Sequence, residues 1–90
     1  MINHHGIFYN RLYPVTILMA TTYRAKYSQL LLRLREARLE AGLTQVEVGK
    51  KLKQPQAYVS KIERGERRVD VVELAEFAKL YGKPLDYFIK

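Results

Sequence analysis

The 90-residue chain contains no cysteine, so it can form neither a disulfide nor a thiolate zinc site. Its two histidines, His4 and His5, are adjacent, and two imidazoles without a nearby acidic residue do not make up a zinc site. The chain also lacks a nucleophile elbow, a phosphate-cradling glycine loop and a pair of carboxylates at catalytic spacing. We therefore expect no metal, no cofactor and no enzymatic activity.

Acidic residues are scarce, with nine Asp and Glu against 16 Lys and Arg and a net charge of +7. This balance favours an anionic partner, either nucleic acid or a membrane surface, without choosing between them. The excess charge is concentrated in residues 44–68, which hold seven basic residues and three acidic ones. Any anion-binding surface of the folded part is therefore expected there.

Long hydrophobic runs are absent, and the apolar stretch Val15–Ala20 is far too short to span a bilayer. The first 27 residues contain no acid and lack a helical period. Met19 and the residues after it resemble an ordinary protein start, so our hypothesis is that residues 1–18 are dispensable upstream sequence. The alternatives are a strand over Ile7–Leu18 that pairs with another copy, and membrane attachment through residues 7–20.

We accordingly divide the chain into two parts. Residues 1–27 form an N-terminal extension, either disordered or upstream of the true start, and residues 28–90 form the single folded domain. Apolar residues recur at spacings of three and four from Ser28 onward, which predicts a first helix that ends at Gly42.

Local start and stop signals predict the remaining helices. Thr44 and Glu47 form a T-x-x-E capping box at the start of a second helix. Pro55 suits the first turn of a third helix, residues 55–64. Asp70 and Glu73 repeat the capping pattern for a fourth helix, and a short turn over residues 85–89 follows Pro84. The chain is therefore expected to be all-α, with five helices.

One glycine lies where it weakens a helix. Gly49 is inside the second helix, where it costs about 1 kcal/mol relative to alanine. Close approach of the next helix at that point would explain why a side chain is avoided. Two short helices joined by a tight turn, the second with a polar and basic face, are typical of a helix-turn-helix.

Residues 30–89 resemble the phage-repressor type of helix-turn-helix domain, the Cro/XRE family. The resemblance depends on the runs Ala41–Gln45 and Val59–Arg68, on Glu47 and Leu52, and on the spacing between them. It departs from the family at Gly49, where alanine is usual, and at the turn Lys53-Gln54, where glycine is common.

The resemblance implies a lambda-repressor-like, five-helix fold and a sequence-specific regulator of transcription that binds double-stranded DNA, in the cytoplasm with the nucleoid. We favour DNA over a membrane as partner, and repression over activation, because a lone domain can act by occupying a promoter. Two alternatives remain: the antitoxin of a toxin–antitoxin pair, whose partner is a toxin protein, and the controller of a restriction–modification system.

The family's pattern assigns roles to individual residues. The base-reading positions are Gln56, Ala57, Ser60 and Lys61. The backbone-contacting positions are Thr44, Gln45, Lys53, Gln54, Tyr58, Arg64, Arg67 and Arg68. Arg38 and Glu63 match a structural ion pair. Glutamine suits adenine, alanine a thymine methyl and lysine guanine, whereas arginines along the backbone set affinity and register. For Tyr58, packing of the ring is the alternative to a phosphate contact.

The apolar C-terminus Tyr87, Phe88 and Ile89 is a candidate homodimer interface. The alternative is that these residues cap the core of their own monomer. A dimer is expected because one small module buries little surface on DNA, and two half-sites whose centres lie ~10 bp apart, or a multiple of that turn, supply the affinity.

Overall fold

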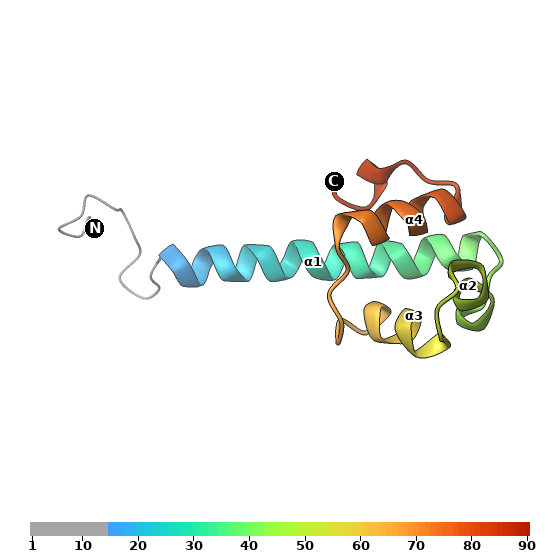
Figure 1. Cartoon of the computed structure of the whole chain (residues 1–90). Coiled ribbons are helices and arrows are strands. Elements are labelled where there is room, and N and C mark those ends of the chain that lie inside the picture. Colours follow the sequence, from blue (N-terminus) through green and yellow to red (C-terminus); the bar gives the residue numbers. More distant parts are fainter. Residues whose placement is uncertain (1–14) are drawn as a thin grey trace.

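The computed structural model describes the backbone of residues 15–90 and the side chains from residue 22 onward. This part of the chain is all-helical and contains no strand (Figure 1). Its α-helices are α1 (Val15–Glu40), α2 (Gln45–Leu52), α3 (Gln56–Glu63) and α4 (Val71–Tyr81), and the 3-10 turn η1 (Leu85–Tyr87) follows them. The expected fifth helix is thus a single 3-10 turn.

The first helix is longer than predicted. α1 begins at Val15 instead of Ser28, so the alternative of a strand over Ile7–Leu18 is wrong for Val15–Leu18. The rest of that proposed strand, His4 and His5 lie outside the described residues. No glycine or proline occurs between Pro14 and Gly42, so nothing in the sequence interrupts the helix. Its outer half extends beyond the other helices (Figure 1), and a helix without a core to face shows no apolar period.

The core lies where α1 meets the other three helices. The six largest side chains that are almost completely buried come from every α-helix and from the C-terminal end: Leu34, Val48, Val59, Ile62, Phe77 and Phe88. Because α2 and α3 each contribute one or two of these residues, both short helices are fixed against α1 and α4 by their apolar faces.

Both predicted capping boxes are present. The Thr44 hydroxyl accepts a hydrogen bond from the Glu47 N–H at 3.1 Å, and the Glu47 carboxylate accepts one from the Thr44 N–H at 3.0 Å. Asp70 and Glu73 make the same reciprocal pair at the start of α4. Two N–H groups at the start of α2 and two at the start of α4 are therefore satisfied by local side chains.

The turn between α2 and α3 is tight. A Cβ at Gly49 would lie 2.7 Å from the Gln54 carbonyl oxygen, so the predicted close approach exists and its contact is the turn backbone. Lys53 occupies the left-handed position with φ of 57°, the only non-glycine residue with positive φ in the described part. Lysine thus takes the conformation that favours glycine, which explains how the turn closes without one.

No helix in residues 15–90 is both long enough and apolar enough to cross a membrane.

Candidate nucleic-acid interface

α3 separates its side chains between two faces. Val59 and Ile62 are completely buried, whereas Gln56, Ala57 and Lys61 are exposed. Ser60 is half-buried, and its hydroxyl donates a hydrogen bond to the Ala57 carbonyl at 3.3 Å. The four residues expected to read bases therefore lie on the side of α3 opposite the core, at spacings that a helix brings together.

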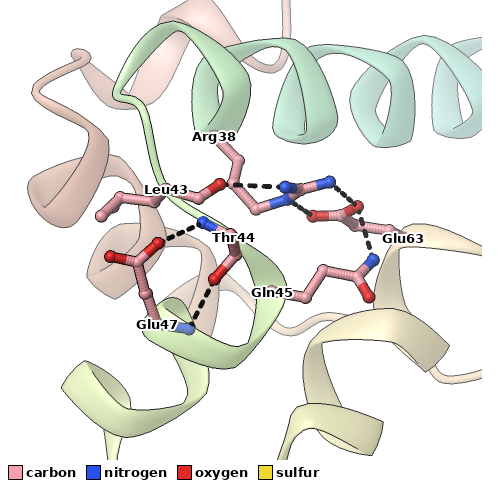
Figure 2. Close-up of polar contacts among 6 residues, drawn as sticks. All are labelled: Arg38, Leu43, Thr44, Gln45, Glu47 and Glu63. Atoms are coloured by element: carbon pink, nitrogen blue, oxygen red, sulfur yellow. Dashed lines mark hydrogen bonds and ion pairs between the residues drawn. The ribbon is translucent and has the colours of Figure 1, made fainter.

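A buried ion pair joins the end of α3 to α1. Arg38 donates to both carboxylate oxygens of Glu63, through Nε at 2.7 Å and Nη2 at 3.1 Å (Figure 2). The side chains are 9% and 7% exposed. The hydrogen bonds to Glu63 raise the pKa of the Arg38 guanidinium above its ordinary value. Arg38 Nη1 also donates to the Leu43 carbonyl at 3.0 Å, which ties the chain entering α2 to the same guanidinium.

Gln45, the first residue of α2, belongs to this network. Its Nε2 donates to Glu63 Oε1 at 3.1 Å (Figure 2). A side-chain amide has two N–H donors, so the second is left for another acceptor. Gln45 is half-buried at the N-terminus of an eight-residue helix. The hydrogen bond to Glu63 thus fixes the orientation of the Gln45 amide.

The arginines that follow α3 all have partners within the protein. Arg64 pairs with Glu66 at 2.6 Å, both with more than half of the side chain exposed. Arg67 pairs with Glu73 at 2.9 Å and lies 4.8 Å over the ring of Tyr58. The Arg64–Glu66 pair is exposed on both sides and contributes little to stability, so it is readily exchanged for another anion, whereas the carboxylate of Glu73 is only 19% exposed.

Arg68 is held by tyrosines of α1. Its guanidinium lies 5.1 Å from the ring centroid of Tyr23 and 4.9 Å from that of Tyr27, and it donates to the Tyr23 hydroxyl. Tyr27 accepts a hydrogen bond from the Val69 N–H at 3.2 Å. Neither tyrosine was expected from the sequence to contact Arg68, although tyrosines cluster beside basic residues before Ser28.

The ring of Tyr58 packs mainly against the protein itself. Its half-buried ring stacks on Phe77 with centroids 6.1 Å apart. Burial raises the pKa of its hydroxyl to about 12. Tyr58 therefore remains neutral at physiological pH, and its ring packs against the guanidinium of Arg67.

The remaining backbone-contact candidates lie at the two ends of α2. Lys53 and Gln54 are exposed in the turn. The Thr44 hydroxyl is used as the helix cap. Thr44 and Gln45 also line a shallow, open hollow with Gln56, so the start of α2 and the start of α3 share one surface.

The three C-terminal candidates for a dimer interface differ in how far they are buried. Phe88 is 1% exposed and belongs to the monomer core, so its assignment to a dimer interface is corrected: the ring is covered by its own chain. Tyr87 is half-buried, with the Lys83 ammonium 4.7 Å over its ring. Only Ile89 remains largely available, at 63% exposure.

Within the described residues, no group of three or more His, Cys, Asp or Glu side chains is arranged to hold a metal ion.

Comparison with known proteins agrees with this arrangement. A family model described as Helix-turn-helix matches residues 34–88. A solved structure titled "XRE-family like protein from Pseudomonas syringae pv. tomato str. DC3000" shares 41% sequence identity and superposes with a TM-score of 0.75. The match covers 79% of this chain and 87% of that one. A search of curated protein sequences finds no significant match.

Proposed function

Because the chain belongs to the XRE-type helix-turn-helix family of DNA-binding transcription regulators, we propose that it reads a specific operator and represses transcription there. The observation that carries this proposal is the face of α3 opposite the core, where Gln56, Ala57 and Lys61 are exposed and Ser60 is half-buried. A major groove admits one α-helix, and its base edges present donors and acceptors that Gln and Lys match.

The proposed complex has α3 in the major groove and the start of α2 on the phosphate backbone. Gln45 would give its second N–H to a phosphate while its first stays on Glu63. The N-terminus of α2 adds free N–H groups and the positive end of a helix dipole. Thr44, Lys53 and Gln54 lie at the two ends of α2, where they border this backbone contact.

Arg64 and Arg67 supply the electrostatic part of the affinity in this proposal. Arg64 would exchange the exposed carboxylate of Glu66, and Arg67 the half-buried carboxylate of Glu73, for a phosphate, which carries a full charge and does not depend on base identity. Tyr58 supports Arg67 and would reach the backbone only through it. Lys61 is the one basic residue on α3 itself, within the base-reading set.

We further propose that the operator is a pseudo-palindrome bound by a homodimer. A single α3 covers few base pairs, and two copies would double the contacts with half-site centres one helical turn apart, or a multiple of it. Ile89 is the exposed residue of the C-terminal apolar set and is the starting point for mapping the interface, with Tyr87 beside it.

Selection of binding sites from a random duplex library, at about physiological salt, tests the proposal. Recovery of an inverted repeat would support a dimeric, sequence-reading regulator, and a reporter driven from that operator would give the sign of regulation. Recovery of no sequence above background would contradict operator reading and favour a protein partner, as for an antitoxin. A methylase gene beside the operator would point to the control of a restriction–modification system.

A further inference from the structure

One side of α1 faces α3 and the loop that follows it. Arg38 on this side contacts Glu63 at 2.7 Å. Leu31, seven residues earlier, packs closely on Gly65. A Cβ added at Gly65 would lie 3.1 Å from Leu31 Cδ1. Seven residues are about 20° short of two full helical turns, so Arg38 and Leu31 lie on nearly the same face.

Arg24 continues this face outward. It precedes Leu31 by another seven residues and is exposed. It therefore lies on the α3 side of α1, about 10 Å further along the helix axis than Leu31. Within residues 22–90, Arg24 forms no ion pair, and the residues matched by the family model begin only at 34. The helix-turn-helix fold alone does not account for this residue.

Arg68, in the loop that follows α3, contacts this outer part of α1. Its guanidinium rests on the stacked rings of Tyr23 and Tyr27, whose centroids are 6.1 Å apart. Its partners are neutral rings and a hydroxyl, and among the described residues no carboxylate pairs with Arg68. The loop after α3 is thereby held against the segment that carries Arg24 (Figure 1).

With α3 in the major groove, the α3-facing side of outer α1 would lie at about the same height above the groove floor as the phosphates that flank the groove. A major groove is about 8.5 Å deep, and an α-helix with its side chains is about 10–12 Å across. When α3 lies in the groove, the flanking phosphates therefore rise to about the height of the side of α3 that faces α1. Cations on the α3 side of α1, beyond the end of α3, lie at that height.

We propose that Arg24 and Arg68 form a second DNA-backbone contact, on the outer half of α1, that flanks the site read by α3. This inference rests on the proposed function, because it assumes that α3 enters the major groove. It assigns a binding role to a segment that precedes the family-matched residues. The contact adds affinity and footprint length without base preference.

Charge indicates DNA rather than a second copy of the chain as the partner of this surface. The first acidic residue of the whole sequence is Glu36, so the outer part of α1 offers cations and no carboxylate. A second copy would bring the same cations and be repelled, whereas each phosphate neutralised by a cation releases counterions and strengthens binding.

The experiment compares Arg24→Ala with Lys26→Ala in the full chain, on a duplex recovered from site selection and extended by random flanks. Lys26 is also exposed and basic, but it lies about 200° around α1, beside Ile89 and Lys90. Arg24→Ala is expected to lower the slope of log affinity against log salt by about 0.9. A fourfold rise in salt then weakens the variant about 3.5-fold less than the parent. Hydroxyl-radical protection of the outer flank should disappear.

Lys26→Ala is expected to leave both readouts unchanged, and Arg24→Lys to restore the slope. The inference is overturned if the Arg24→Ala slope equals that of the parent chain. It is also overturned if both alanine variants lower the slope equally, which indicates diffuse charge, or if Arg24→Ala changes only the oligomeric state. Failure of the parent chain to select any duplex would instead contradict the proposed function itself.

Discussion

Glu63 Oε1 accepts a hydrogen bond from Gln45 Nε2 at 3.1 Å, and the same oxygen accepts a second one from Arg38 Nη2 at 3.1 Å. One carboxylate at the end of α3 thereby sets the orientation of an amide at the start of α2. In the proposed complex that amide binds a phosphate, so the ion pair is both part of the scaffold and the support for a DNA contact.

Glu63→Gln should lower the free energy of unfolding by about 2–3 kcal/mol, because it leaves the buried Arg38 guanidinium without its countercharge. Urea denaturation at neutral pH measures this loss. The double variant Arg38→Met, Glu63→Leu should recover part of it, since removing both charges also removes the unpaired one. A Glu63→Gln protein as stable as the parent would show that the pair contributes no net stability.

Lys53→Gly should stabilise the protein by about 0.5–1 kcal/mol. Lys53 has φ of 57°, a conformation that costs a residue with a Cβ more than it costs glycine. Lys53→Ala removes the same charge but keeps the Cβ, so its urea midpoint should stay close to that of the parent. Equal midpoints for the glycine and alanine variants would mean that the left-handed turn is not strained.

The sequence predicted the short helices well because their limits are coded locally. Thr44 and Asp70 cap α2 and α4 by exchanging hydrogen bonds with the glutamate three residues further on, and Gly82 ends α4 with φ of 69°. The start of α1 could not be predicted in the same way. Periodicity detects only a helix that faces a core, and the outer half of α1 has none to face.

Contacts between distant residues were also beyond the sequence. Arg68 and Tyr23 are 45 residues apart, and no spacing rule brings them together. Phe88 and Ile89 are neighbours in an apolar run, yet one is in the core and the other is exposed. Which of two adjacent apolar residues faces inward after a single 3-10 turn depends on how α4 is placed on α1.

Acid should destabilise the fold through the carboxylate of the second capping box. Hydrogen bonds from Arg67 and from the Asp70 N–H lower the pKa of Glu73 below its ordinary value of 4.5. The charged form is therefore favoured in the folded state, and its stabilisation is complete above the unfolded pKa and lost as pH falls through the folded pKa. Thermal unfolding at neutral pH and at ~pH 3 should show a smaller acid shift for Glu73→Gln than for the parent. Equal shifts would remove Glu73 from the acid response.

Replacement of Gln56 by alanine tests whether α3 reads bases. Gln56 is exposed at the first position of α3, and a glutamine bidentate to adenine N6 and N7 discriminates by about 1–3 kcal/mol. Gln56→Ala should therefore weaken binding to the selected operator by that amount and relax the preference at one base pair. Gln29→Ala is the matched control, because Gln29 is exposed on the side of α1 away from α3 and should change neither property. The decisive measurement is affinity for the four operators that differ at that base pair. Equal loss on all four would contradict base reading, since a phosphate contact weakens every sequence alike.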